Sequence, residues 1–238
     1  MENTGYVALS FAVGLERKMS VVANNIANVD TAGYKSSHVL FNEYVVKNTR
    51  QPPLSMMNDI GNYRNAAPGP IQVTGNPLDV ALEGNGFLAV MTPEGERYTR
   101  NGTLRLDVQG QLITSAGDQV VDEGGKPIII PAGSGQINIT PEGTISTDQG
   151  DVGAFKIVRF DDPQSLVPIG DTLYETDQAP IIDENTRVTQ GAVEGSNVNS
   201  VMEMTNMIEV MRKYQSVARL LQNEHDSQIN MIQKLGRV

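Results

Sequence analysis

The chain has 238 residues and no cysteine, and its 28 acidic and 18 basic residues leave a formal net charge of −10. This length is enough for one large domain or two modest domains with a hydrophobic core, and the lack of cysteine excludes disulfides and cysteine-ligated metal sites. The acidic balance argues against nucleic acid as a partner, because no cluster of Lys and Arg opposes it.

No apolar run approaches the ~20 residues that a membrane-spanning helix requires. The amino-terminal residues also lack the pattern of a cleavable secretory signal, because Glu2 replaces the basic start and polar residues interrupt the apolar stretch. We therefore expect no direct membrane span, and export, if it occurs, without a cleavable signal peptide.

The first predicted element is an amphipathic helix. It begins near Asn3 or Thr4, either of which can cap it, and it ends before Gly33. Its apolar residues recur at spacings of three or four and therefore share one face. These residues are Ala8, Phe11, Leu15, Met19, Val22, Ile26 and Val29.

Three asparagines, Asn24, Asn25 and Asn28, crowd the end of this helix, although asparagine is a mediocre helix former. A buried asparagine can fix the register and the partner of a helix, since its amide finds hydrogen bonds in one alignment and not in others. Solvated amides at a fraying helix end explain the same residues equally well. The small residues Ala23 and Ala27 would let another helix approach closely.

Residues 35–76 carry little periodicity and are predicted to form a connector or arm. Phe41, Tyr44, Val45 and Val46 are compatible with a short strand. Prolines break up the segment that follows, at Pro52, Pro53, Pro68 and Pro70.

From about Pro77 the sequence changes to short apolar runs separated by turn residues. Strands with turns every ~8–12 residues are typical of an antiparallel sandwich or barrel. The apolar runs include residues 78–82, 87–90, 104–108, 128–130, 137–139 and 155–160. The turns are predicted at Gly95, Gly110, Gly117, Gly125, Gly143 and Gly150.

The last predicted element is a second amphipathic helix, which Ser196, Asn197 or Ser200 can cap. Its seam residues alternate at spacings of four and three, which is a heptad repeat. They are Met207, Met211, Tyr214, Ala218, Leu221, His225, Gln228, Ile232 and Leu235. Two terminal seams suggest that the chain ends pair with each other or with other subunits. The alternative is that each helix packs on its own domain.

No candidate catalytic or metal site withstands inspection. Residues 84–89 match the spacing of a dinucleotide-binding glycine motif, but that chemistry needs a helix after the glycines and Pro93 would break it, so we predict a turn that enters a strand. His38 and His225 lie in different elements without a converging partner. The loop at residues 148–151 does not match a calcium-binding loop and is predicted to be a hairpin turn. We expect no enzyme activity, cofactor or metal.

Three segments together resemble bacterial flagellar rod and hook proteins. Residues 23–35 (Ala-Asn-Asn-Ile-Ala-Asn-Val-Asp-Thr-Ala-Gly-Tyr-Lys) resemble the amino-terminal signature of that family, residues 98–112 its core hairpin, and residues 191–208 its carboxyl-terminal signature. The resemblance spans essentially the whole chain. Tyr34 and Leu88 depart from it, since phenylalanine is commoner at both positions. Residues 41–45 and 68–80 look most like the proximal rod type, and the distal rod and hook types are the alternatives.

The resemblance implies a structural subunit of the flagellar basal-body rod, located in the periplasmic space. Such a subunit is exported by the flagellar type III apparatus and assembles through its terminal helices into the axial tube. The tube crosses the periplasm, transmits torque and leaves a central export channel. The implied partners are proximal and distal rod proteins, further copies of the chain and the export apparatus. A secreted binding module or adhesin with helical oligomerisation ends is the alternative from a different class.

We therefore predict an α+β chain whose terminal helices pair as a coiled coil. Residues 1–34 and 190–238 form a helical core domain, residues 35–76 a connector, and residues 77–189 a central antiparallel β-rich domain that is sandwich- or barrel-like. The predicted assembly interface comprises Ala8, Phe11, Leu15, Met19, Val22, Asn24, Asn25, Ile26, Asn28, Met207, Met211, Tyr214, Ala218 and Leu221.

Overall fold

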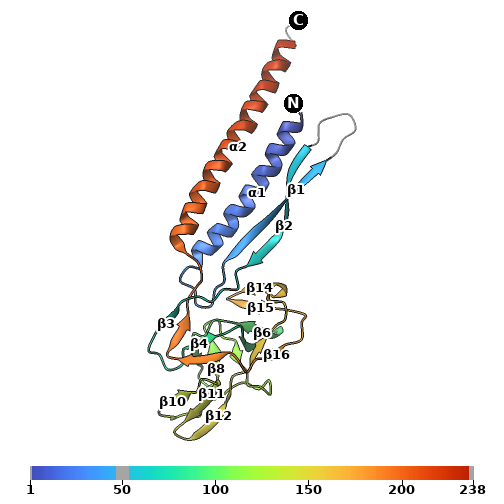
Figure 1. The fold of residues 1–238 in the computed structure, drawn as a ribbon. Helices are drawn as coiled ribbons and strands as arrows, with labels where there is room; N and C mark the ends of the chain where they lie inside the picture. Colours follow the sequence, from blue (N-terminus) through green and yellow to red (C-terminus); the bar gives the residue numbers. More distant parts are fainter. Residues whose placement is uncertain (1, 47–53, 236–238) are drawn as a thin grey trace. The chain divides into compact units, whose positions relative to one another are not determined.

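The computed structural model describes residues 2–46 and 54–235, and its contacts divide the chain into two compact units (Figure 1). The first, called here the helical unit, comprises Met1–Ala27, Ser36–Asn65 and Asn199–Val238. The second, called the β unit, comprises Asn28–Lys35 and Ala66–Val198. These contacts group residues 36–65 with the two terminal segments. The division into core, connector and β-rich domain drawn from the sequence stays a prediction.

The two units differ in charge. The β unit contains 20 acidic and 8 basic residues, a net charge of −12, whereas the helical unit contains 8 acidic and 10 basic residues, a net charge of +2. The β unit therefore carries all of the chain's excess negative charge.

The helical unit contains two antiparallel helices, α1 (Glu2–Ala27) and α2 (Ser200–Leu235), so the start of α1 and the end of α2 lie at the same end of the pair (Figure 1). At a rise of 1.5 Å per residue, α1 is about 39 Å long and α2 about 54 Å. The expected caps were wrong for α2: Asn199 caps it, since its side-chain oxygen accepts a hydrogen bond from the Met202 N–H at 3.1 Å.

A long hairpin packs on α1 in the same unit. Strands β1 (Ser37–Val46) and β2 (Leu54–Arg64) pair antiparallel, with a bulge next to Leu40, and α1 contacts both of them as well as α2. A Cβ atom on Gly14 would overlap the sulfur of Met57, so a glycine here lets α1 approach the hairpin. The sequence predicted only a short strand. Pro52 and Pro53, used in that prediction, lie outside the described residues.

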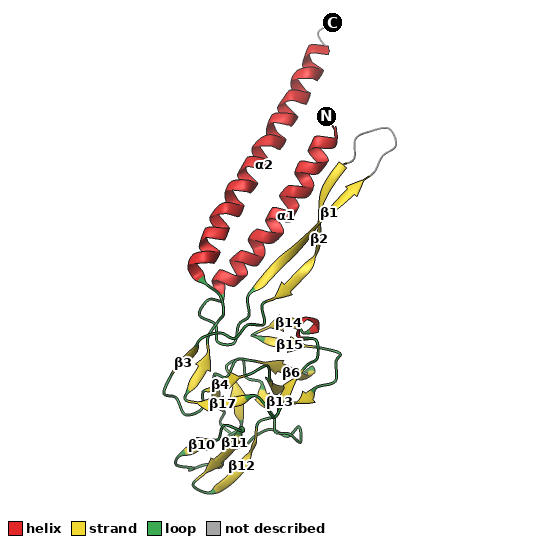
Figure 2. Cartoon of the chain, viewed as in Figure 1, coloured by secondary structure: helices red, strands yellow, loops and turns green. Residues whose placement is uncertain are grey.

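The β unit is built from antiparallel strands, coloured yellow in Figure 2. Its largest sheet runs in the order β14 (Val167–Gly170), β15 (Leu173–Glu175), β6 (Gly95–Thr99), β5 (Phe87–Thr92), β9 (Gln119–Val120), β8 (Leu112–Thr114) and β7 (Leu104–Leu106). Strand β13 (Ile157–Arg159) joins β5 to β16 (Ile181–Ile182).

Three smaller sheets complete the described part of the unit. One contains β10 (Ile137–Ile139), β11 (Thr144–Thr147) and β12 (Gly150–Ala154); the others pair β17 (Arg187–Gln190) with β4 (Val80–Glu83) and β18 (Ala192–Glu194) with β3 (Ile71–Val73). A single-turn 3₁₀ helix spans Pro163–Ser165. The prediction of terminal helices around a central antiparallel β-rich region is confirmed, but the described strands form no closed barrel.

Strand β5 lies between two apolar clusters because its side chains alternate in direction. Leu88 and Val90 pack into a cluster with Leu112, Ile145 and Phe155. The alternate residues Phe87 and Ala89 pack into a second cluster, where Phe87 joins the aromatic side chains of Tyr98, Phe160 and Tyr174. Burial first, and then the neighbouring Glu96, raises the pKa of Tyr98 to about 12. The β unit thus has a core of its own.

The turn predictions hold. All six predicted turn glycines have a positive φ, a conformation that glycine adopts without steric cost. Strand β5 begins at Phe87, which confirms that residues 84–89 form a turn into a strand. No helix in the described part of the chain is long and apolar enough to cross a membrane.

Candidate assembly interface and two buried polar centres

The predicted interface residues of α1 are mostly covered inside the subunit. Ala8, Leu15, Val22 and Asn25 are buried, and Asn24 is exposed. Phe11, Met19, Ile26 and Asn28 are half-buried. The apolar stripe of α1 is thus largely used against the hairpin and α2, which are its neighbours in the helical unit.

The predicted residues of α2 divide into two groups. Met207, Tyr214 and Leu221 are half-buried, whereas Met211 and Ala218 are exposed. From Glu203 to Glu224, and with the half-buried Asn206 as the exception, the residues that α2 buries at least partly alternate at spacings of four and three. They are Glu203, Met207, Val210, Tyr214, Val217, Leu221 and Glu224. Of the seam residues expected from the sequence, Met207, Tyr214 and Leu221 lie on this face, and Val210, Val217 and the acids Glu203 and Glu224 join them.

Met211 and Ala218 belong to a second stripe on α2 that the subunit leaves exposed. Val210 is 2% exposed and the adjacent Met211 is 45% exposed, so the two stripes are distinct faces. The apolar members of the exposed stripe are Met204, Ile208, Met211, Ala218, Ile229 and Ile232. Helix α1 also exposes apolar side chains at helical spacing, namely Tyr6, Leu9 and Val13.

Asn25 joins three elements of the helical unit and is 0% exposed. Its amide nitrogen donates to the Ser37 carbonyl at 2.9 Å, and its amide oxygen accepts from the Ser37 N–H at 3.0 Å. The same amide nitrogen lies 3.4 Å from Oε2 of Glu203, the buried acid in the first turn of α2. We call Asn25, Ser37 and Glu203 the amide centre. The sequence allowed two interpretations of the asparagine cluster: a buried asparagine that fixes the alignment of the helix, or solvated amides at a fraying end. Asn25 is buried and hydrogen-bonded, as the first interpretation requires.

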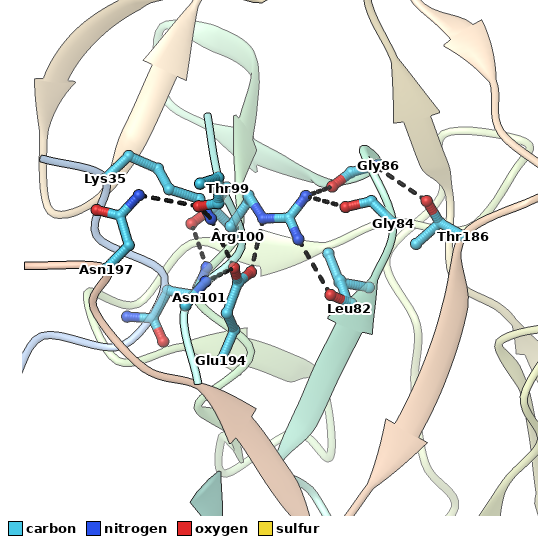
Figure 3. A network of polar contacts seen from close by, with 12 residues as sticks. Lys35, Leu82, Gly84, Gly86, Thr99, Arg100, Asn101, Thr186, Glu194 and Asn197 are labelled. Carbon is cyan, nitrogen blue, oxygen red and sulfur yellow. Dashed lines mark hydrogen bonds and ion pairs between the residues drawn. The ribbon is translucent and has the colours of Figure 1, made fainter. Parts of the chain in front are cut away.

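A second polar centre lies in the β unit and is charged (Figure 3). Glu194 ends β18, and its carboxylate accepts from Lys35 Nζ at 2.6 Å, from Arg100 Nε at 2.7 Å and from the Gly69 N–H at 2.8 Å. The side chains of Lys35, Arg100 and Glu194 are 7%, 4% and 1% exposed. We call these three residues the charged centre.

Arg100 uses its remaining N–H groups on backbone carbonyls. Nη1 donates to Gly84 and Gly86 at 2.9 and 2.8 Å, and Nη2 donates to Leu82 at 3.0 Å (Figure 3). A Cβ atom on Gly86 would crowd Ile157 and Thr186. The glycines that imitate a nucleotide-binding motif therefore form a close-packed turn whose carbonyls bind an arginine.

The ionisation of the charged centre follows from burial and charge. Burial, the largest influence, lowers the pKa of Lys35, and the hydrogen bond and charge of Glu194 offset it only partly. Burial alone would raise the pKa of Glu194. The charge of Arg100, hydrogen bonds from Lys35 and Gly69, and the charge of Lys35 together outweigh burial and hold that pKa below its usual value. Glu194 is therefore an anion held between two cations.

The charged centre unites the three segments that carry the family resemblance. Lys35 ends the first, Arg100 lies in the second and Glu194 in the third. The sequence interpretation assigned these residues no role, because nothing in one sequence shows that positions more than 90 residues apart are in contact. A signal was nevertheless present, since Lys35, Arg100 and Glu194 each lie within two residues of a glycine in their segment.

Comparisons with known proteins match these same regions. Residues 7–35 match the family model "Flagella basal body rod protein" and residues 189–233 match "Flagellar basal body rod FlgEFG protein C-terminal". Residues 81–147 match "Flagellar hook protein FlgE/F/G D1 domain".

Whole-length relatives agree with the family models. The flagellar basal-body rod protein FlgF of Caulobacter vibrioides is 36% identical over 244 residues that cover 100% of both chains. FlgF of Escherichia coli is 33% identical and is matched over 95% of this chain and 96% of its own length. The rod protein FlgG of Buchnera aphidicola from Schizaphis graminum is 31% identical over 92% of this chain and 93% of its own.

Proposed function

The chain belongs to the family of flagellar basal-body rod proteins and is a structural subunit of that rod, and on this premise we propose that its helical unit is the part that assembles. The observation that carries the proposal is the exposed apolar stripe of α2. The family is not an enzyme class, and it implies assembly with other rod components in the basal body.

Within one subunit, we propose that α1 and α2 pair as a short antiparallel coiled coil. Support comes from the alternating burial along α2 and from the contact between the two helices. The α1 residues of the predicted interface, with Met207, Tyr214 and Leu221, then act inside the subunit. They present the outer faces in a fixed alignment.

Between subunits, we propose that the exposed stripe of α2 packs against the exposed side chains of α1 in a neighbouring rod subunit. The contact joins two different patches, because a patch that bound itself about a twofold axis would close a dimer and stop the growth of a tube. The neighbours are further copies of the chain and the adjacent proximal and distal rod proteins. The helices then surround the export channel.

We also propose export through the flagellar type III apparatus without a cleavable signal peptide, and a role in transmitting torque across the periplasm. Three relatives named FlgF match 99% or more of the chain, which favours the proximal rod type over the distal rod or hook type. The secreted adhesin is the weaker candidate. It predicts that cells lacking the protein still build a hook and filament, whereas a rod subunit predicts that neither forms.

The exposed stripe is tested by Ala218→Glu, which places a charge in the proposed contact without disturbing the subunit. Ser216→Glu is the matched control, because Ser216 is exposed on the same helix but ~160° away around it. With each variant as the cell's only copy, we expect Ala218→Glu to abolish swimming and hook formation and Ser216→Glu to preserve both. Circular dichroism of the purified variants should match the wild type. Normal swimming with Ala218→Glu would refute the proposed contact.

A further inference from the structure

The charged centre lies where the chain enters and leaves the β unit. Residues 28–35, 66–70 and 195–198 adjoin the unit boundaries at 27/28, 35/36, 65/66 and 198/199, so every covalent path between the units runs through one of them. We call these three stretches the connecting segments. Glu194 immediately precedes the third of them and contacts the other two directly.

The connecting segments are held to one another by polar contacts around Glu194. The Gly33 N–H donates to the Glu194 carbonyl at 2.7 Å, and the Gly195 N–H donates to the Pro70 carbonyl at 2.8 Å. Lys35 Nζ and Asn197 Nδ2 both donate to the Ala67 carbonyl at 2.9 Å. The three segments thus meet at one carboxylate and one carbonyl.

Apolar packing contributes little to this arrangement. Ala66, Ala67, Pro68 and Pro70 are exposed, and none of the three segments belongs to either apolar cluster of the β unit. At Gly69 a Cβ atom would overlap the Gly195 carbonyl, so the backbones lie in direct contact there. Segments with few apolar contacts open more readily than the core they adjoin. Their order therefore rests on hydrogen bonds between the segments and on the charged centre that these bonds surround.

Glu194 is the last member of this centre to emerge from a ribosome or an export channel. It follows Lys35 by 159 residues, Gly69 by 125 and Arg100 by 94. Until it is in place, burying Lys35 and Arg100 would leave two cations without a counter-ion, which is strongly unfavourable. The segments that carry Lys35 and Gly69 therefore cannot take up their folded arrangement before Glu194 is present.

We propose that Lys35, Arg100 and Glu194 form a lock that holds the three connecting segments on the β unit, with Glu194 as the positioning residue that closes it. The lock is separable from the apolar core: it opens and closes while the sheets stay folded. It goes beyond assembly through the helices, since it concerns the stretches of chain that join the two units covalently.

The test is amide hydrogen exchange of the purified full-length chain with Glu194→Gln. Glutamine keeps the side-chain volume but removes the charge and turns one acceptor oxygen into a donor nitrogen facing Arg100 or Lys35. We expect the amides of Gly33, Gly69, Gly195 and Asn197 to exchange about tenfold faster or more, as for a lost buried hydrogen bond. Those of Val90, Leu112 and Ile145 should remain protected from exchange.

Glu142→Gln is the matched control, because Glu142 forms an exposed ion pair with Arg187 in the same unit. It should leave exchange unchanged at all seven positions. Unchanged exchange in the connecting segments of Glu194→Gln would show that the centre does not hold them. Equal loss of protection in the segments and the core would show that no separable lock exists. Either result overturns the proposal without bearing on rod assembly.

Lys35→Met provides a second variant in case Glu194→Gln does not fold. It preserves the Arg100–Glu194 pair and removes only the contacts of Lys35 with Glu194 and Ala67. We expect faster exchange at Gly33 and Asn197, whose N–H groups join residues 33–34 to Glu194 and to the third segment, and a smaller change at Gly195. An equal change at Gly33, Asn197 and Gly195 would contradict a lock in which the contacts of Lys35 and those of Gly195 hold different segments.

Discussion

Asn25 and Glu194 are the central buried polar residues of the two units, but their polar atoms are satisfied in different ways. Asn25 is neutral, and one backbone residue, Ser37, satisfies both ends of its amide. Glu194 is charged and needs two cations and a backbone N–H. A neutral amide costs little to bury once its alignment is correct, whereas a buried ion pair is only as stable as its full set of partners.

The difference extends to the surroundings of each centre. The β unit buries its apolar side chains in two clusters, while the helical unit leaves a long apolar stripe exposed on α2. The amide centre therefore aligns helices that still have an exposed apolar face. The charged centre holds chain segments on a unit whose two apolar clusters are already buried.

The largest expected effect comes from removing a cation of the charged centre. Arg100→Met leaves Glu194 with one cation and deprives the carbonyls of Leu82, Gly84 and Gly86 of their donor. The free energy of unfolding of the β unit should fall by about 4 kcal/mol. Hydrogen exchange at the core amides of Val90, Leu112 and Ile145, followed as denaturant is added, measures this in the β unit. Arg187→Met, at an exposed ion pair, is the control, and an equal loss in both variants would contradict a special role for the centre.

A smaller loss is expected at the amide centre. Asn25→Asp removes the donor to Ser37 and brings a second carboxylate against Glu203, so the helical unit should lose about 3 kcal/mol. Thermal unfolding followed by far-UV circular dichroism measures the change. Asn24→Asp is the neighbouring control at an exposed position, and there we expect about 0.5 kcal/mol or less. Cells with Asn25→Asp as their only copy should not swim, although the β unit stays folded.

The adjacent residues Val210 and Met211 separate the inner seam of α2 from its outer stripe. Val210→Ala removes two buried methyl groups, and the isolated subunit should lose about 2 kcal/mol. Met211→Ala should leave the isolated subunit unchanged but weaken assembly. Unfolding curves and a swimming assay on both variants measure the two effects. If Met211→Ala destabilised the free subunit and Val210→Ala did not, the assignment of Val210 to the buried face of α2 and of Met211 to the exposed face would be wrong.

The smallest expected effect is the loss of the charged centre's contribution to stability at acidic pH. The pKa of Glu194 is lower in the folded chain than its unfolded value, so its contribution is present above the unfolded pKa of 4.5 and is lost as the pH falls through the folded pKa. The glutamine introduced by Glu194→Gln cannot titrate, and the stability difference between wild type and this variant should therefore shrink in acid. Unfolding measured at neutral and acidic pH tests this. A difference that grew with falling pH would reverse the assigned charge.

Local rules predicted much of the fold. Apolar residues at helical spacing identified both terminal helices, and glycine dipeptides identified the turns, because each signal lies within a few residues of what it specifies. The hairpin was underestimated because β2 contains Asn58, Gly61 and Asn62, which are unfavourable in strands. The buried face of α2 shares Met207, Tyr214 and Leu221 with the heptad read from the sequence, but it also carries the acids Glu203 and Glu224, which no apolar pattern can indicate.

The candidate site was harder to predict, because its residues come from segments far apart in the sequence and no local signal links them. Asn25 could be singled out from its own helix, but its partners Ser37 and Glu203 come from other elements. The charged centre depends on three distant segments that meet only after folding. Sequence spacing carries no information about such contacts until a pattern of strand pairing is known.

The unequal division of charge between the units affects how copies come together in solution. Twelve excess negative charges on the β unit make copies repel one another, and this repulsion is screened over about 8 Å at physiological ionic strength. The nearly neutral helical unit adds little to it. Dilute chains at low salt are thereby kept colloidally dispersed while their apolar stripes are still uncovered, and added salt should promote their association, which light scattering would register.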